Sequence, residues 1–297
     1  MSRFLVTGAA GFIGSHLTEA LMARGDDVVA VDAFTDYYDP SRKEENARSF
    51  EVARLDVAGD DLPLEGVEGV FHLAAQPGVR ASFERLDVYL RRNVLATQRV
   101  LDQSGVRVVY ASSSSVYGDA ETYPTPESTR PSPISPYGVT KLACEHLAHA
   151  SSVDTVGLRY FTVYGPRQRP DMAFARLVEA ALDGTEFELY GDASRSFTYV
   201  ADAVAATIAA MERGTSGAIY NVGGGEEATM REAIGVLKRV SGRKLDVRAE
   251  PPARGDARRT AADVSLIARE LGWEPTTHLE DGLAAQWAWA VDRVAAR

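Results

Sequence analysis

The stretch FLVTGAAGFIG, residues 4–14, is typical of a strand that turns into a helix around a phosphate. Its apolar run at residues 4–6 predicts a strand covered on both faces. Three glycines follow at Gly8, Gly11 and Gly14, and leucines at helical spacing come next. Such a turn points unpaired N–H groups and the positive end of a helix dipole outward, and glycine lets phosphate oxygens approach the backbone. The stretch therefore predicts a dinucleotide site.

A second strand pattern supports this interpretation. The apolar run at residues 28–31 ends in Asp32, close to the offset at which a carboxylate binds an adenosine ribose. The glycine spacing G-x-x-G-x-x-G is one residue longer at its start than the usual fingerprint, so a glycine-rich turn without a ligand is the alternative. A carboxylate here would repel a 2′-phosphate. We therefore expect NAD rather than NADP.

Composition narrows the function classes. The chain has 297 residues, 45% of them hydrophobic and 25% charged, which is ordinary for a globular protein. Its net charge of −10 argues against a nucleic acid or an anionic membrane as the main partner. The single cysteine, Cys144, excludes an intrachain disulfide, no apolar run approaches a membrane span, and the histidines lack metal-ligand spacing. The first strand begins at once, leaving no room for a signal peptide, so we expect a cytoplasmic protein without a metal.

Strand and helix patterns alternate along the first half of the chain. Strands are expected at residues 50–55, 69–73 and 107–111, and helices at residues 83–104 and 137–150. This alternation is typical of an α/β fold with a doubly wound parallel sheet, the Rossmann architecture. Later elements are less regular. Helices are expected at residues 172–182, 200–211, 263–271 and 279–294, and a strand at residues 187–190. We expect an NAD-binding domain at residues 1–165 and a smaller C-terminal α/β substrate lobe at residues 166–297, with segments returning to the first domain.

Catalytic residues are expected after the strand at residues 107–111. A serine run at residues 112–115 leads into a proline-rich loop, and sheets of this kind place their chemistry in such loops. The loop ends at Tyr137, and Lys141 follows four residues later on the same face of a helix. A neighbouring cation makes a phenol a stronger acid, so the pair can accept a substrate proton. Alone, Tyr-x-x-x-Lys is more often a solvated helix face; after this fold and serine run it predicts catalysis.

These motifs resemble the extended short-chain dehydrogenase/reductase family of nucleotide-sugar epimerases, dehydratases and decarboxylases. The resemblance spans nearly the whole chain, through TGAAGFIG, HLAAQ, RNVLAT, SSSSVYG, SPYGVTK, RYFTVYGPRQRPDM, RSFTYVADAV, NVGGG and GDARRTAADVS. It implies NAD as cofactor and a homodimer, whose interface would use the helices at residues 83–104 and 137–150 because both carry apolar residues on more than one side. The NAD contacts that it implies are Gly8, Gly11, Phe12, Ile13, Gly14, Asp32, Asp56, Val57, Ala74, Ala75, Asn93, Tyr137 and Lys141.

The resemblance also implies the reaction. In this family the tyrosine takes a hydroxyl proton while the sugar C4 hydride passes to NAD⁺. The catalytic residues would be Tyr137 and Lys141 together with Ser113, Ser114 and Ser115. Similar dehydratases carry an Asp-Glu pair at the last two serine positions, and similar decarboxylases carry a glutamate at the third. Because neither carboxylate is present, returning the hydride to the other face remains, and that is epimerisation.

The loops FTVYGPRQRPDM, DYYDPSRK and AAQPGVRASF look most like those of UDP-glucuronate 4-epimerases. Arg169 or Arg167 would bind the sugar carboxylate through two hydrogen bonds, unless one of them only pairs with Asp171 or contacts phosphate. Alternatives are a UDP-glucose or UDP-N-acetylhexosamine 4-epimerase, a UDP-glucuronate decarboxylase and a non-enzymatic NAD-binding regulator. Arg254 departs from the family pattern, because no residue separates it from Gly255. The implied substrate contacts are Arg80, Thr162, Arg167, Arg169, Arg195 and Arg254.

Overall fold

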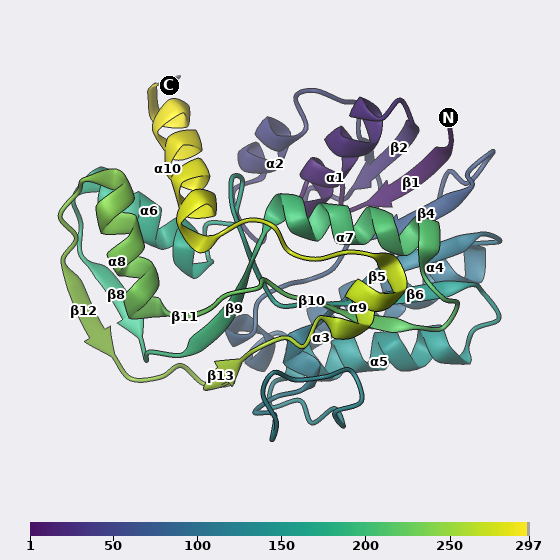
Figure 1. Cartoon of the computed structure of the whole chain (residues 1–297). Coiled ribbons are helices and arrows are strands. Elements are labelled where there is room, and N and C mark those ends of the chain that lie inside the picture. The colour runs from purple at the N-terminus through teal and green to yellow at the C-terminus, as the bar shows by residue number, and fades with distance from the viewer. Residues whose placement is uncertain (296–297) are drawn as a thin grey trace.

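A seven-stranded parallel sheet forms the centre of the computed structural model, which describes residues 1–295 (Figure 1). Neighbouring strands are parallel throughout. Strand β1 lies between β2 and β4, so the chain winds outward from it in both directions and leaves a crevice beyond the strand ends. This confirms the predicted Rossmann fold. In sheet order the strands are β10 (Ile219–Val222), β6 (Thr155–Tyr160), β5 (Arg107–Ser113), β4 (Gly69–His72), β1 (Arg3–Thr7), β2 (Asp27–Asp32) and β3 (Ala53–Arg54).

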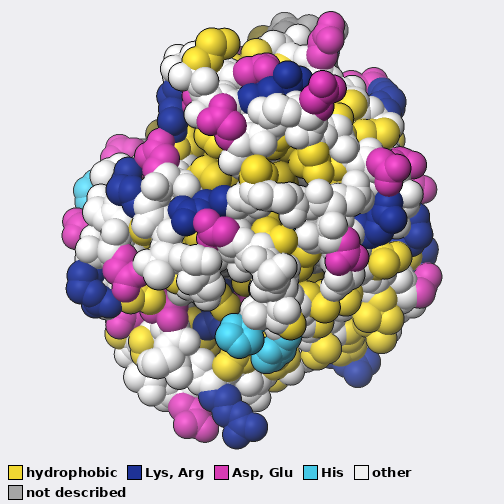
Figure 2. Space-filling model, turned by 90° about the vertical axis from the view of Figure 1, so that its right-hand side faces the viewer, with side chains coloured by type: hydrophobic (Ala, Val, Ile, Leu, Met, Phe, Trp, Pro, Cys, Tyr) yellow, Lys and Arg dark blue, Asp and Glu magenta, His cyan; other side chains and the backbone are white. Residues whose placement is uncertain are grey.

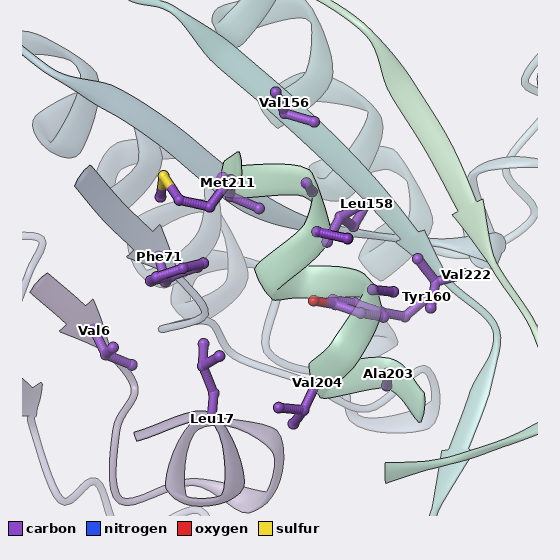
Figure 3. Close-up of a cluster of buried hydrophobic side chains, with 14 of the residues drawn as sticks. Val6, Leu17, Phe71, Val156, Leu158, Tyr160, Ala203, Val204, Met211 and Val222 are labelled. Carbon is purple, nitrogen blue, oxygen red and sulfur yellow. The ribbon is translucent and has the colours of Figure 1, made fainter. Parts of the chain in front are cut away.

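Helices cover both faces of this sheet. Side chains alternate along each strand, so Val6 and Phe71 join one buried cluster while Leu5 and Val70 join another. Figure 3 shows the first cluster, in which Leu17 and Met211 approach the sheet from two helices. On that face lie α1 (Phe12–Ala23), α7 (Val200–Arg213) and α9 (Ser265–Leu271), and on the other α4 (Ala96–Gln103) and α5 (Pro136–Ala150).

A smaller lobe follows, with a core of its own. One four-stranded and one two-stranded sheet pack with three helices around Phe174, Leu237 and Leu283 (Figure 1). Its strands are β7 (Thr162–Tyr164), β9 (Ser194–Tyr199), β11 (Glu227–Thr229), β13 (Arg259–Thr260), β8 (Phe187–Tyr190) and β12 (Val247–Glu250). Its helices are α6 (Ala173–Asp183), α8 (Met230–Ser241) and α10 (Leu279–Ala295). The late elements β10, α7 and α9 belong to the first core, and the boundary at residue 165 stays a prediction.

One local prediction was wrong, and another differs in detail. The predicted strand at residues 50–55 forms only β3, because just two of its residues pair with β2 at the sheet edge. The predicted helix at residues 83–104 is confirmed over residues 86–103, where α3 (Leu86–Tyr89), the π-helical η2 (Leu90–Leu95) and α4 follow one another without a gap. Only its start differs, because a separate 3₁₀ helix, η1 (Arg80–Phe83), precedes it. The wider π turn holds Asn93, whose side chain accepts the Gln76 N–H at 2.6 Å and donates to Thr140 at 3.0 Å.

The outer surface is mixed in character. On the face shown in Figure 2, basic and acidic side chains are interspersed, with hydrophobic side chains between them. Within residues 1–295, no helix combines the length and the apolar character that a membrane span requires. In the same range, no group of three or more His, Cys, Asp and Glu side chains is arranged to hold a metal ion.

Candidate active site

A cavity of about 840 Å³ lies at the carboxyl ends of the central strands, between the two lobes. It is lined by the glycine turn, the ends of β2, β4 and β5, the start of α5 and loops of the smaller lobe. This position is where open parallel sheets bind ligands. Predicted site residues that line it are Gly8, Gly11, Phe12, Ile13, Gly14, Asp32, Asp56, Val57, Ala74, Ala75, Arg80, Ser113, Ser114, Ser115, Tyr137, Lys141, Thr162, Arg169 and Arg195.

The glycine turn is tight enough to require glycine. Gly8 has a φ of +73°, and a Cβ on Gly14 would lie 2.1 Å from the Gly8 carbonyl oxygen. Helix α1 starts after Gly11, and no side chain caps its N-terminus. The first N–H groups of α1 are therefore available to an anion, beside the walls formed by Phe12 and Ile13. This arrangement fits the pyrophosphate of a dinucleotide.

Two carboxylates lie at the ends of neighbouring strands. Asp32 is 5% exposed at the end of β2, and its Oδ1 accepts the N–H of Phe34 at 2.7 Å. Lys43 Nζ donates to the same oxygen at 3.0 Å. This lysine was missed from the sequence, although it stands in DYYDPSRK on the short helix α2 (Pro40–Asn46). Asp56 forms an ion pair with Arg91 at 2.7 Å. Burial opposes ionisation of Asp56, but the hydrogen bonds from Arg91 and the Ala58 N–H, with the charges of Arg91 and Arg92, together lower its pKa.

The catalytic candidates meet where β5 ends. Ser113 caps the short helix η3 (Ser114–Val116), because its side chain accepts the Ser115 N–H at 3.2 Å. Helix α5 packs closely on this turn, since a Cβ on Gly138 would lie 2.5 Å from the Ser115 carbonyl oxygen. The start of α5 thereby brings Tyr137 and the serines to one wall. Lys141, one turn later, donates from Nζ to the Ala111 carbonyl oxygen at 2.9 Å.

Three arginines line the cavity: Arg169 and Arg195 come from the smaller lobe, and Arg80 comes from η1 of the first lobe. Arg169 donates from Nε and from a terminal nitrogen to the two oxygens of Asp171, both at 3.0 Å. Arg195 donates to the Ser194 carbonyl oxygen at 2.9 Å, and burial lowers the pKa of its guanidinium. Arg80 pairs with Asp256 at 3.2 Å and stacks 4.4 Å over the ring of Tyr190.

Three predicted site residues do not reach the cavity. Arg167 has a φ of +63°, and its guanidinium is directed to Glu19 of α1, 2.9 Å away. The guanidinium of Arg254 lies 4.2 Å over the ring of Phe83. This position is consistent with its departure from the family pattern, in which one residue separates the arginine from the glycine. Asn93 is 1% exposed and lies behind the wall, where it holds the backbone of Gln76. The direct contacts expected for these three residues stay predictions.

The arrangement can remove a proton beside a bound dinucleotide. A phenol next to a buried ammonium, at the end of a strand that faces a glycine turn, is suited to taking a hydroxyl proton while a hydride leaves the same carbon. Such a fold and site define a short-chain dehydrogenase/reductase. The chain belongs to the NAD dependent epimerase/dehydratase family, whose model matches residues 4–223.

Relatives with related names match over nearly the whole chain. An uncharacterized UDP-glucose epimerase of Bacillus subtilis (strain 168) is 39% identical, covering 97% of each chain. The structure of the UDP-glucuronic acid 4-epimerase from Bacillus cereus, in complex with UDP-glucuronic acid and NAD, matches with a TM-score of 0.94 and 38% identity over 98% of this chain and 99% of that one. A UDP-glucose 4-epimerase from Thermotoga maritima, solved with UDP-glucose, matches with a TM-score of 0.91 and 32% identity over 98% and 99%.

Proposed function

We propose that this protein is an NAD-dependent 4-epimerase that converts UDP-glucuronate to UDP-galacturonate through a 4-keto intermediate. The observation that carries the proposal is the composition of one cavity. Tyr137 and Lys141 face it with three serines, none of them replaced by a carboxylate, and Arg169 lies in the same cavity. A Bacillus cereus relative that is 38% identical is named for this activity and was solved with UDP-glucuronic acid and NAD.

The residues have separate tasks in this reaction. Tyr137 removes the proton of the sugar C4 hydroxyl, and Lys141, fixed by the Ala111 carbonyl, supports the charge that develops on the phenol. Ser113 donates a hydrogen bond to the C4 oxygen. NAD⁺, when bound, would supply the hydride acceptor and donor for C4. Tyr137 returns the proton to the C4 oxygen when the ketone is reduced from its opposite face, which inverts the C4 configuration.

The residues that would hold the cofactor line the same cavity. The open N-terminus of α1 would hold the pyrophosphate, and the buried carboxylate of Asp32 would bind the adenosine ribose. Asp56 and Val57 follow β3, beyond Asp32 at the sheet edge, whereas Ala74 and Ala75 follow β4, on the side of Tyr137. Asn93 lies behind this lining and would contribute indirectly, by holding the backbone of Gln76.

Arg169 is the residue that selects a uronate in this proposal. The 4-keto form of glucuronate is a β-keto acid, which loses CO₂ when its carboxylate stands perpendicular to the ketone. A guanidinium that binds this carboxylate can hold it in another orientation. Arg195 and Arg80 line the same cavity and remain for the diphosphate and nucleotide.

Substitution of Arg169 tests the proposed substrate. Arg169→Ala leaves a buried sugar carboxylate without its partner, a loss of about 2–5 kcal/mol, or roughly 1.5 to 4 powers of ten in kcat/KM. UDP-glucose lacks that charge and should be affected far less. Arg169→Lys should recover only part of the loss, because an ammonium cannot make the planar two-point contact. Equal losses on both substrates would assign Arg169 to the diphosphate or to folding.

A UDP-glucose 4-epimerase is the second candidate, and one observation favours it. Arg169 already forms an ion pair with Asp171, so the local charge is balanced without a sugar carboxylate. Two relatives are also named for UDP-glucose. Turnover of UDP-glucose, UDP-glucuronate and UDP-N-acetylglucosamine, compared by kcat/KM, separates the candidates: a preference for either neutral sugar would replace the uronate proposal.

We further propose a homodimer. Large apolar side chains are exposed on the helices that the sequence assigned to an interface: Leu90 is 49% exposed on η2 and Val139 is 53% exposed on α5. Leu86 and Leu95 add to this surface, at 43% and 42% exposed. Joining two such surfaces would bury them in a four-helix contact. The proposed cytoplasmic location fits the lone thiol of Cys144, which is buried and unpaired with another cysteine.

A further inference from the structure

Three loops that are far apart in the sequence meet at one edge of the cavity. Tyr37 belongs to the loop between β2 and α2, and Gly78 to the loop after β4. Arg169 and Asp171 belong to the loop between β7 and α6. All four residues line the cavity. The loop that carries Tyr37 follows β2, the strand that ends in Asp32. This edge of the cavity therefore joins the residue proposed to bind the cofactor ribose to Arg169, which is proposed to bind the sugar carboxylate.

Asp171 is held from two directions. Its two oxygens accept from the Arg169 guanidinium at 3.0 Å each, and Oδ2 also accepts the Tyr37 hydroxyl at 3.2 Å. Burial and the nearby Asp171 raise the pKa of the Tyr37 phenol, which therefore stays protonated and acts as a donor. The side chain of Arg169 is 18% exposed, and its guanidinium forms an ion pair with Asp171. We infer that Asp171 sets the position of this guanidinium.

The Tyr37 hydroxyl occupies a space that Gly78 leaves open. Gly78 has a φ of +96°, and a Cβ at this position would lie 2.3 Å from the Tyr37 oxygen. The Gly78 carbonyl oxygen accepts the Tyr89 hydroxyl at 2.6 Å. The ring of Tyr89 packs edge to face on Tyr137, with centroids 6.2 Å apart. Tyr37 is thus seated on the wall that also supports the catalytic tyrosine.

We propose that Tyr37 and Asp171 are positioning residues, which fix the Arg169 guanidinium against the sugar carboxylate and so suppress loss of CO₂ during epimerisation. This inference rests on the proposed function. Asp171 takes one edge of the guanidinium through Nε and one terminal nitrogen, which leaves one N–H of that nitrogen and the other terminal nitrogen for a two-point contact with the substrate. A guanidinium fixed in its plane holds the carboxylate in one orientation, and one that can rotate does not.

The suppressed side reaction has a definite product. In the 4-keto intermediate the bond between C5 and the carboxylate carbon breaks, CO₂ leaves, and the electron pair passes into the C4 carbonyl as an enolate. The enolate takes a proton from water at C5 and becomes a UDP-4-keto-pentose. The hydride removed earlier stays on the cofactor, which remains reduced. Each loss of CO₂ therefore yields one 4-keto-pentose and one reduced cofactor, and both can be quantified.

Tyr37→Phe tests the proposal, because it removes one hydrogen bond and leaves every charge in place. With UDP-glucuronate, the ratio of CO₂ released to UDP-galacturonate formed should rise on the order of 2- to 10-fold. Dissociation constants from calorimetry should show weaker binding of UDP-glucuronate by a similar factor, with UDP-glucose unchanged. Asp171→Asn should raise the CO₂ ratio further, because the ion pair to Arg169 is lost. Tyr38→Phe is the matched control, because the adjacent phenol makes no hydrogen bond to Asp171.

The outcomes separate this inference from the proposed function. Suppose that the wild type epimerises UDP-glucuronate and that Tyr37→Phe and Asp171→Asn release the same ratio of CO₂ as the wild type. That result would overturn the positioning roles and leave the proposed function standing. An equal shift in Tyr38→Phe would also overturn them, since it would reflect general disturbance of the loop. If the wild type does not turn over UDP-glucuronate, the proposed function fails. Calorimetry still tests the positioning roles: if Tyr37→Phe binds UDP-glucuronate and UDP-glucose with the same ratio of dissociation constants as the wild type, the inference is contradicted.

Discussion

Lys43 Nζ lies 3.0 Å from Oδ1 of Asp32, and the two side chains are 10% and 5% exposed. The same oxygen accepts the N–H of Phe34, so one edge of the carboxylate is fixed by the protein itself. The carboxylate that would bind the ribose is therefore one half of a buried ion pair. A change at Asp32 changes two features at once: it removes the ribose acceptor and leaves a buried ammonium without a partner.

This pair predicts how cofactor preference changes. Asp32→Ala should weaken NAD binding by roughly 10- to 100-fold, the range for a lost hydrogen bond to a charged group. NADP should be weakened less, because the freed Lys43 can meet a 2′-phosphate. Titration of both cofactors measures the ratio, and the double variant Asp32→Ala with Lys43→Met should remove the relative gain of NADP. Equal weakening of NAD and NADP in the single variant would show that Asp32 does not contact the ribose.

The catalytic pair predicts two different losses. Tyr137→Phe removes the proton acceptor with little change in volume, so turnover should fall by at least about 100-fold while UDP-sugar binding persists. Lys141→Met should lose both activity and cofactor affinity. Ser113→Ala removes one hydrogen bond and should reduce the rate less than either. Initial rates and bound-cofactor content measure these effects, and full turnover by Tyr137→Phe or Lys141→Met would refute the mechanism.

The apolar surface on η2 and α5 predicts the oligomeric state. Val139→Glu or Leu90→Glu places a charge in the proposed four-helix contact and should convert the dimer into a monomer at micromolar concentration. Light scattering measures the mass. Val294→Glu is the matched control, because Val294 is 56% exposed on α10, away from that surface, and should leave the dimer intact. A monomeric wild type would exclude the proposed interface.

His72 predicts an acid sensitivity of the fold. Its ring contacts Thr7 at 2.9 Å and Thr97 at 3.2 Å, and burial with nearby Lys141 lowers the His72 pKa to about 3. The unfolded chain, with a pKa of about 6.5, then binds more protons below that pH. The free energy of unfolding should fall by up to about 1.4 kcal/mol for each pH unit between about 6.5 and 3. Urea unfolding of His72→Gln should give a shallower slope between pH 6.5 and 5; equal slopes would contradict the assignment.

Much of the first lobe could be predicted because its signals are local. The glycine turn, the carboxylate of Asp32 and the Tyr137–Lys141 pair each depend on residues a few positions apart on one element. The π turn around Asn93 was not predictable in this way. The Asn93 side chain in this turn accepts a hydrogen bond from Gln76, which lies on a different segment.

The second lobe needed tertiary information. Arg167 and Arg169 stand in one motif and carry the same charge, yet the positive φ of Arg167 turns it toward Glu19. Which arginine faces the cavity cannot be derived from their spacing. Lys43 and the Tyr37–Asp171 contact were missed for the same reason, because the partners meet only after the chain has folded. The loops that carry them gave no periodic pattern to interpret.

The most direct test of this account is the product analysis of the purified wild-type protein incubated with UDP-glucuronate and NAD⁺. Separation of the sugar nucleotides by chromatography, together with measurement of CO₂, follows both fates of the 4-keto intermediate. We expect a stable mixture of UDP-glucuronate and UDP-galacturonate with little CO₂ released. A UDP-pentose as the main product, or no conversion of the uronate while UDP-glucose is epimerised, would contradict the assignment.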